Sequence, residues 1–168
     1  MIQEAIRQLI NKRTDKPCMV IPGYTSNPQP KKPFAAMYLI SDVRDDVYDS
    51  DIEVKTDDEV TETTKYWREF TFQFDVLGNT DEETRTKADE LLKLITYKMR
   101  YSDWQVNNIG ITNPTLSITN RNEKVDREYI YRYTFDITFE SEVSQERVTQ
   151  LAKKIEGTAN SEKFIVGG

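Results

Sequence analysis

The sequence contains no histidine and only one cysteine, Cys18, among its 168 residues. A disulfide needs two cysteines, a structural zinc site needs several cysteine or histidine ligands, and the common nucleophile pairs need a histidine. Disulfide frameworks, zinc centres, cysteine–histidine pairs and serine–histidine triads are therefore excluded by count. Glycine-rich loops are missing too, because Gly23, Gly78 and Gly110 stand alone and no phosphate-binding pattern such as G-x-x-x-x-G-K-[ST] occurs.

Long hydrophobic runs are absent as well. No stretch of the sequence approaches the roughly 20 apolar residues that cross a bilayer as a helix. The N-terminus, Met1-Ile2-Gln3-Glu4, has neither the basic region nor the apolar region of a signal peptide. We therefore expect a soluble protein that has no membrane partner.

Basic residues are too few for nucleic-acid binding of the usual kind. The chain has 23 Lys and Arg residues against 29 Asp and Glu residues, which gives a formal net charge of −6. Affinity for nucleic acid comes mainly from neutralising phosphates with lysine and arginine. DNA could pass close to such a protein, but we do not expect specific binding.

The length is that of a single domain. A chain of 168 residues can bury about two thirds of its unfolded surface, which is enough for a real core. We expect a single α+β domain over residues 1–156 and a flexible C-terminal tail over residues 157–168. This tail is small and polar except for Phe164, Ile165 and Val166.

The clearest local pattern is a strand followed directly by a helix. Apolar side chains alternate with polar ones over residues 66–76, which is the period of a strand with one buried face. A Gly-Asn turn ends this strand, and Thr80 with Glu83 has the form of a capping box that begins a helix. The apolar stripe of this helix comprises Ala88, Leu91, Leu92, Ile95 and Met99. Strand, turn and helix should pack as one unit.

Periodicity and short apolar runs predict the remaining elements. They are a helix over 2–12, strands over 18–21 and 34–40, an extended piece over 104–106, a short strand over 116–118 and a long strand over 127–140. The last two strands should form a hairpin that turns near residues 120–123. Ser144 is expected to cap a final helix that carries Val148, Leu151 and Ile155. Strands and helices do not alternate strictly, so the predicted fold class is α+β, with a mixed, mostly antiparallel sheet and helices packed on one face.

Acidic residues dominate the segment from Ser41 to Thr63, where only Arg44 and Lys55 are basic. A segment of this composition cannot bury enough apolar surface to fold alone. Sparse alternation of apolar residues within it could still support a long, solvated hairpin arm next to the sheet. We favour this acidic arm over a disordered loop.

Carboxylate clusters are the first candidates for chemistry, because they can bind Mg²⁺ or Ca²⁺ or act as acid and base. The Asp45–Asp51 cluster superficially resembles a calcium loop, but the required glycine and the glutamate at the twelfth position are missing. Asp75 and Asp136 lie near strand ends, as in some nucleases, yet each is on the polar face of its strand. A solvated charged surface is therefore favoured over a metal or catalytic site.

Aromatic residues provide two further candidates. Tyr129, Tyr131 and Tyr133, with Phe135 and Phe139, could form a stacking platform for bases. Their face continues into Ile137 and the opposite face is polar, so core positions are favoured. Trp67 stands on the otherwise polar side of its strand. It indicates either a contact with another subunit or the presence of a covering helix.

Together, these features resemble the tail terminator (neck or tail-completion) proteins of tailed bacteriophages. The similarity extends from Ile2 to about Glu140, and its most specific part is the strand Tyr66–Gly78 with the Thr80-capped helix. Proteins of that family form a hexameric ring that caps the tail tube, stops its polymerisation and joins the tail to the head. The resemblance implies a structural virion protein without enzymatic activity and without a cofactor.

The resemblance also implies partners and a location. The chain would form a homo-oligomeric ring and meet the tail tube protein and a head-completion or connector protein, while DNA passes through the channel without specific binding. It would be made in the host cytoplasm and end in the virion, at the tail or neck. The residues after Glu140 extend beyond the part that carries the resemblance.

Subunit or partner contacts are expected in the acidic arm, in the tail and at the unusual tryptophan. The candidates are Trp67, Asp45, Asp46, Asp49, Asp51, Ile52, Val54, Phe164, Ile165 and Val166. No catalytic, cofactor-binding or metal-binding residue is predicted. The alternatives are another phage neck, head-completion or tube-capping component, or a non-viral α+β module that binds a ligand or a protein in a concave pocket.

Overall fold

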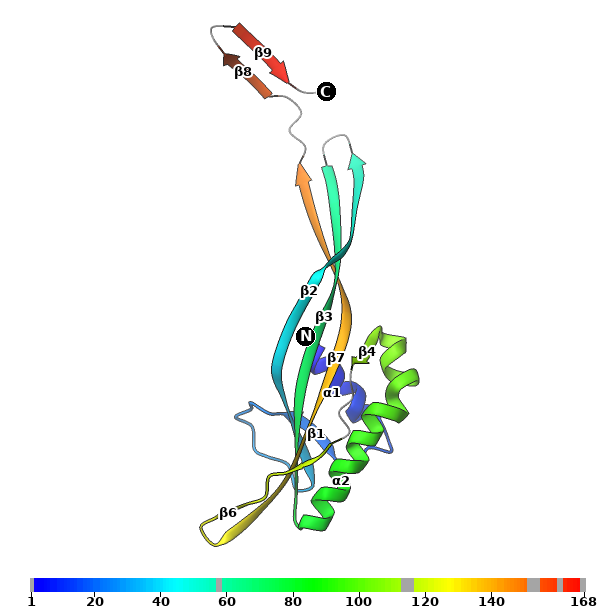
Figure 1. Ribbon diagram of the computed structural model, residues 1–168, viewed down its shortest axis with the longest axis vertical. Helices are drawn as coiled ribbons and strands as arrows, with labels where there is room; N and C mark the ends of the chain where they lie inside the picture. The colour runs from blue at the N-terminus through cyan, green and yellow to red at the C-terminus, as the bar shows by residue number, and fades with distance from the viewer. Residues whose placement is uncertain (1, 57–58, 113–116, 151–154, 160–161, 167–168) are drawn as a thin grey trace. The chain divides into compact units, whose positions relative to one another are not determined.

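The computed structural model describes residues 2–56, 59–112, 117–150, 155–159 and 162–166, with side chains described up to residue 148 except at 46–48 and 54–59. The elements, shown in Figure 1, are α1 (Ile2–Lys12), β1 (Met19–Pro22), β2 (Phe34–Thr56), β3 (Glu59–Gly78), α2 (Asp81–Lys93), η1 (Leu94–Lys98), η2 (Arg100–Trp104), η3 (Gln105–Asn107), β4 (Ile109–Thr112), β5 (Thr119–Asn120), β6 (Glu123–Val125), β7 (Glu128–Gln150), β8 (Ile155–Ala159) and β9 (Glu162–Val166). The fold divides into unit 1 (Met1–Arg44 with Arg68–Ser141) and unit 2 (Asp45–Trp67 with Glu142–Gly168).

The main sheet is mixed and mostly antiparallel. In the described residues it has seven strands, in the order β1-β2-β3-β7-β4, and β5 and β6 pair with β7 off this path. β1 runs parallel to β2, whereas β4, β5 and β6 run antiparallel to β7. β2 and β3 are hydrogen-bonded neighbours with only residues 57–58 between them, a connection that only antiparallel strands permit. The predicted α+β fold class is confirmed.

One face of the sheet in unit 1 is covered by the helices α1 and α2 (Figure 1). The alternating β3 side chains Phe70, Phe72, Phe74 and Val76 are at most 5% exposed, and Phe74 stacks on Phe135 of β7 at 5.2 Å. The same cluster includes Ile6 and Ile10 from α1 and Ala88, Leu91 and Leu92 from α2. Burial of each large apolar side chain contributes about 1.5–3 kcal/mol. The predicted packing of this strand on the following helix is confirmed.

The start of β2 buries side chains on both faces of the sheet. Ala35 and Met37 join the helix-covered core, while Phe34 and Ala36 form a second cluster with Ile21 of β1. This matches the prediction of a central strand covered on both sides. The burial ends soon afterwards, and Ile40 is 50% exposed.

Cys18 precedes β1 and belongs to the helix-covered core. Its side chain is 7% exposed, and burial raises the pKa of the thiol to about 12. The thiolate, which is the reactive form of cysteine, is therefore scarce at neutral pH.

Helix α2 begins as the capping box predicts. The Glu83 amide donates to Thr80 Oγ1 at 3.2 Å, and Thr80 is the N-cap. The Glu83 carboxylate reaches back and accepts from the Asn79 amide at 2.7 Å. Two amides at the helix start therefore have side-chain partners.

Residues 104–106 are helical, so the predicted extended piece is wrong. The helical path continues from α2 through η1 and η2 into η3. Trp104 is fully buried, donates from its indole to the Ile95 carbonyl at 2.8 Å, and packs edge-on against Phe139 at 5.3 Å. This core contact holds the chain in a helical turn where local periodicity suggested a strand.

The predicted final helix from Ser144 is also wrong in the described residues, because β7 continues as a strand to Gln150. In unit 2, the Thr64 hydroxyl of β3 donates to the Gln145 carbonyl of β7 at 3.4 Å. Pairing with β3 supplies a hydrogen-bond ladder that outweighs a weak helical period. Leu151 lies outside the described residues, and Ile155 opens β8 rather than continuing a helix.

The hairpin before β7 turns later than predicted. β6 pairs with the start of β7, and residues Asp126 and Arg127 form the turn, with Asp126 at a φ of 55°. Aspartate tolerates this left-handed conformation better than most residues. The partner predicted over residues 116–118 is shifted to β5 and β6, and residue 116 lies outside the described residues.

Unit 2 consists of strands in its described residues. Parts of β2, β3 and β7 form what we call the three-strand ribbon, and β8 pairs antiparallel with β9 as a separate two-stranded sheet. The described residues of the acidic segment therefore belong to β2 and β3. That this segment projects as an arm, and that residues 157–168 are flexible, stay predictions. Among the described residues, no helix has the length and apolar character needed to cross a bilayer.

Replacing Thr80 by alanine should destabilise the fold by about 1 kcal/mol, because the Glu83 amide loses its side-chain acceptor. Urea unfolding, followed by circular dichroism, measures this change. Thr86→Ala on the exposed side of α2 is the matched control, and it should be neutral or slightly stabilising since alanine is the better helix former. Equal losses in both variants would contradict a capping role for Thr80.

Candidate interaction surfaces

The β1 edge of the sheet is closed by a side chain from α1. Asn11 donates from Nδ2 to the Val20 carbonyl at 2.7 Å and accepts from the Val20 amide at 2.9 Å. Both backbone groups of a strand residue point to the same side, so Val20 and Pro22 face away from β2. Asn11 hydrogen-bonds both backbone groups of Val20, and Pro22 has no N–H group that could donate to a further strand. This edge is unavailable for pairing with another chain.

The β4 edge, at the other end of the sheet, is open. β4 pairs with β7 on one side, from Ile109 opposite Ser141 to Thr112 opposite Thr138. On its other side, no strand and no hydrogen bond from the described residues reaches its backbone. An edge of this kind is a template for pairing with a further strand.

A groove of about 270 Å³ runs beside the β4 edge. It is lined by Arg100, Tyr101, Trp104, Gln105, Ile109, Gly110, Ile111 and Glu140. Tyr101 is 70% exposed, and the Arg100 guanidinium lies 5.8 Å from its ring centre. Exposed tyrosine and arginine are the residue types that most often anchor protein contacts.

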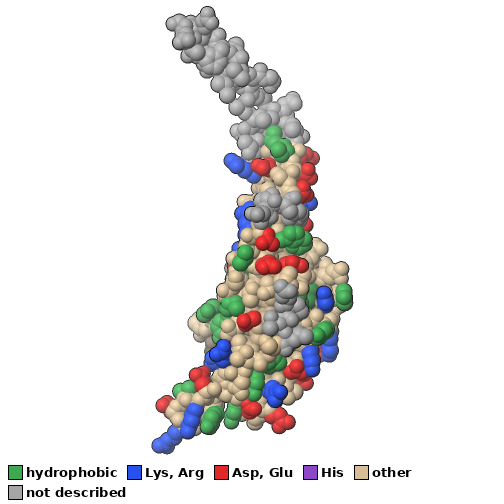
Figure 2. Space-filling view, viewed as in Figure 1, with side chains coloured by type: hydrophobic (Ala, Val, Ile, Leu, Met, Phe, Trp, Pro, Cys, Tyr) green, Lys and Arg blue, Asp and Glu red, His purple; other side chains and the backbone are tan. Residues whose placement is uncertain are grey.

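The outer edge of β2 is open beyond Met37, because β1 is its only partner on that side among the described residues and pairs only with Phe34–Met37. This part of the strand is acidic, and Asp45, Asp49 and Asp51 are exposed. Asp42 makes a two-pronged ion pair with Arg68 of β3 at 2.6 and 2.7 Å, which lowers the pKa of that carboxyl. Figure 2 shows acidic side chains and single apolar side chains reaching the surface along these strands.

The predicted interface residues fall on unit 2, and their role in subunit contacts stays a prediction. Ile52 is 70% exposed on β2 and Trp67 is 39% exposed on β3. Asp49 lies 3.8 Å from Lys65 on the neighbouring strand. Asp46 and Val54 are in β2 and Phe164, Ile165 and Val166 are in β9, but their side chains lie outside the described residues.

Asp75 is not the solvated carboxylate that its polar strand face suggested. It is 6% exposed and accepts hydrogen bonds from the Thr134 hydroxyl at 2.8 Å and the Gln73 amide at 2.9 Å. Asp136 is more exposed, and partial burial of its carboxyl group together with the negative charge of Asp75 raises its pKa against the opposing effect of Arg121. Among the described residues, no group of three potential ligands is placed to hold a metal ion.

The tyrosines of β7 are only partly in the core. Tyr133 is 6% exposed, as expected, whereas Tyr129 is 58% exposed, so its predicted core position is wrong. Tyr129 stacks on Tyr131 at 6.1 Å, and Lys124 lies 5.8 Å from the Tyr129 ring centre. The strand β6, which pairs with this part of β7, has the sequence Glu-Lys-Val. It contains no large aromatic side chain that could cover Tyr129.

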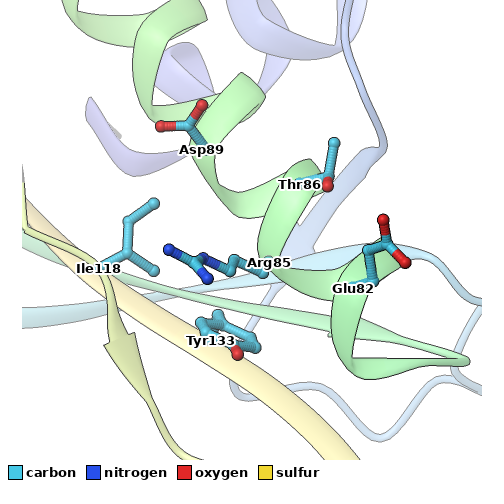
Figure 3. Close-up of a pocket in the computed structure, with 6 residues that line it drawn as sticks. All are labelled: Glu82, Arg85, Thr86, Asp89, Ile118 and Tyr133. Carbon is cyan, nitrogen blue, oxygen red and sulfur yellow. The ribbon is translucent and has the colours of Figure 1, made fainter.

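A wider groove of about 600 Å³ lies between α2 on one side and Ile118, just before β5, and Tyr133 of β7 on the other (Figure 3). Glu82, Arg85, Thr86 and Asp89 line it from α2, and Arg85 points across the groove toward Ile118 and Tyr133. At its end, the Tyr133 hydroxyl donates to Asp81 at 2.9 Å. The mixture of charges and the open shape suit protein contact better than a small ligand.

A family model described as phage neck terminator protein matches residues 2–163. The chain belongs to this phage neck terminator family. The resemblance that the sequence suggested is thereby confirmed, and the match extends beyond Glu140, where the resemblance had ended. No curated protein matches the chain.

Membership defines the general role of this family member. Phage neck terminator proteins are structural proteins of the virion, located at the neck and tail. Open strand edges and exposed aromatic residues are therefore the relevant surfaces. Sequence reasoning missed Asn11, Arg100 and Tyr101, because none of them stands in a local pattern that reveals its position at a sheet edge. The adjacent Arg100-Tyr101 pair at the polar end of a helix was the only available signal.

Replacing Asn11 by alanine should cost about 1–3 kcal/mol, because both Val20 backbone groups lose their partner. The variant should also aggregate more readily, since the β1 edge opens. Urea unfolding measures the first effect and static light scattering the second. Lys12→Ala, an exposed neighbour, is the control, and equal behaviour of the two variants would contradict the role of Asn11.

Replacing Asp136 by asparagine should stabilise the protein at neutral pH. A carboxyl whose pKa is raised by folding binds its proton more tightly in the folded state, so its ionised form opposes folding at higher pH. The advantage should disappear below about pH 3, where the wild-type carboxyl is also protonated. Thermal unfolding at both pH values measures it. An unchanged difference at low pH would show a packing effect rather than a charge effect.

Proposed function

We propose that this family member forms a ring of six copies that caps the tail tube and presents the surface joined to the head. The observation that carries the proposal is the three-strand ribbon of unit 2. It exposes Ile52, Trp67 and Val148, and no helix among the described residues of unit 2 covers it. A ribbon of three strands gains stability when an apolar face is covered, and neighbouring subunits would supply that cover.

The open edges of the sheet support the same proposal. A closed ring requires two different surfaces on each subunit, so that the contact repeats from copy to copy. The β4 edge and the outer edge of β2 beyond Met37 are different in sequence and in charge. The interface candidates of the ribbon and of β9 remain part of this proposal.

The partners follow from the ring. One face would meet the tail tube protein and the other a head-completion or connector protein. A net charge of −6 would keep the channel from binding phosphates, so that DNA passes without specific contact. The protein would be made in the host cytoplasm, and its role would require neither catalysis nor a cofactor.

The test is the absolute mass in solution by light scattering across protein concentration, with negative-stain images of any large species. The expected result is a six-copy ring with a central hole, either alone or at the ends of purified tail tubes. Tail tubes to which the protein is added should stop growing and keep a constant length. A chain that stays monomeric and leaves tube ends free to grow would overturn the proposal.

Ile52→Glu should weaken ring formation by about ten- to a hundred-fold, because it removes an apolar contact worth about 1.5–3 kcal/mol and adds a charge. The same light-scattering series measures this change. Met19→Glu is the matched control, since Met19 is 50% exposed on the closed β1 edge. Loss of assembly in both variants, or in neither, would contradict a role of the ribbon in the interface.

A further inference from the structure

We propose that the open edge of β4 receives the acidic β2 strand of a second copy of this chain. The inference rests on the proposed ring and names the contact that would join its subunits. It begins with the backbone of β4, which has four residues and no proline. Residues of an antiparallel strand alternate between facing their partner and facing outward. Two β4 residues therefore point N–H and C=O groups away from β7, and no described residue bonds to them.

The alternative pairings on the sheet are disfavoured. The β1 edge is closed by Asn11 and Pro22. Two β2 edges would bring acidic strands together, and like charges placed opposite each other are destabilising. The stretch of β7 beyond Ser141, which no β4 residue pairs, carries Glu142, Glu146 and Arg147, so its net charge of −1 does not attract an acidic strand. The β4 edge is therefore the edge to which we expect β2 of a second copy to add.

Charge around β4 favours an acidic strand. Arg100 lines the groove beside β4, and Glu140 is the acidic residue that lines it too. Near the ends of α1 and η1, Arg13 and Lys98 are linked to Asp15 and Asp103 by contacts of 3.0–3.4 Å, and Lys16 donates to the Arg13 carbonyl at 3.0 Å. Together these groups carry four positive charges, on Arg13, Lys16, Lys98 and Arg100, against three negative charges on Asp15, Asp103 and Glu140, an excess of one. A strand bearing Asp45 and Asp51 would meet the Arg100 guanidinium beside this edge.

The geometry of the groove also suits a strand. Its volume of about 270 Å³ lies directly along Ile109–Ile111, so side chains of an added strand have a place next to the new backbone ladder. Exposed Tyr101 forms one wall and buried Trp104 contributes to the lining. Strand addition of this kind takes affinity from main-chain hydrogen bonds and specificity from side-chain pockets.

The contact joins unlike surfaces, β4 of one copy and β2 of the next. Such a heterologous contact leaves each dimer with one free surface of each kind, so that growth continues, and a rotation of 60° per subunit would close a ring of six. The acidic side chains of β2 act twice in this scheme. They disfavour pairing of β2 with itself, and they favour the β4 edge, which has Arg100 beside it.

The experiment uses charge reversal on the full-length chain. Arg100→Glu reverses the charge beside β4, and the double variant Asp45→Lys with Asp51→Lys reverses two charges on β2. Sedimentation velocity across concentration should show self-association weakened at least about tenfold in each variant alone. Arg127→Glu, the same change at the exposed turn between β6 and β7, is the control and should associate like the wild type.

An equimolar mixture of the two variants gives the decisive result. The β4 side of the Arg100→Glu variant, now acidic, then meets the β2 strand of the double variant, now basic, so association should return toward the wild-type level. Amide hydrogen exchange should show that residues 109–112 become protected as the wild-type chain associates. A mixture that stays dissociated, or association without this protection, would overturn the inference. A wild-type chain that is monomeric at every concentration would overturn it too.

This outcome is separate from the test of the proposed function. Rings that form equally well in the wild type and in Arg100→Glu would reject the β4–β2 contact and leave the ring in place. Absence of rings on tail tubes would reject the ring, whatever the exchange at residues 109–112 shows.

Discussion

The packing of aromatic side chains between β3 and β7 is the interaction on which the rest of the structure depends. Phe74 stacks on Phe135, and Phe72 and Trp104 both pack edge-on against Phe139. These contacts join the two long central strands to each other and to the end of the helical path. Because α1 and α2 bury their apolar stripes on the same seam, its loss would release both helices and the strands outside it.

The sheet has β1 at one edge and β4 at the other, on either side of this aromatic packing, and the two edges differ in structure. One is closed by a side-chain amide and a proline, whereas the other keeps its backbone groups and has an arginine and a tyrosine beside it. The strand β2 also continues past its partner β1 with mostly acidic side chains. The unequal treatment favours one way of meeting a neighbour and disfavours the rest.

Local patterns in the sequence predicted the centre of the fold and failed toward its margins. The strand over residues 66–76 and the helix after Thr80 were predictable, since alternation, turn and cap all agree there. Trp104 was misplaced because its position depends on the Ile95 carbonyl, which the helical path brings next to the indole, and on Phe139 of β7, which is distant in sequence. The end of β7 was misread for a similar reason, since pairing with β3 decides it. Of the candidate surfaces, the acidic segment was visible as composition, but the closed and open edges were not, because an edge exists only once the strand order is known.

The buried cysteine has a practical and chemical consequence. Cys18 is the only thiol in the chain, and its burial keeps it protonated and out of reach of reagents while the protein is folded. A cysteine introduced on the surface would therefore be the sole reactive thiol of the native protein. Spectroscopic probes or crosslinkers could be attached at one chosen position without altering the core, and reaction of Cys18 itself would report unfolding.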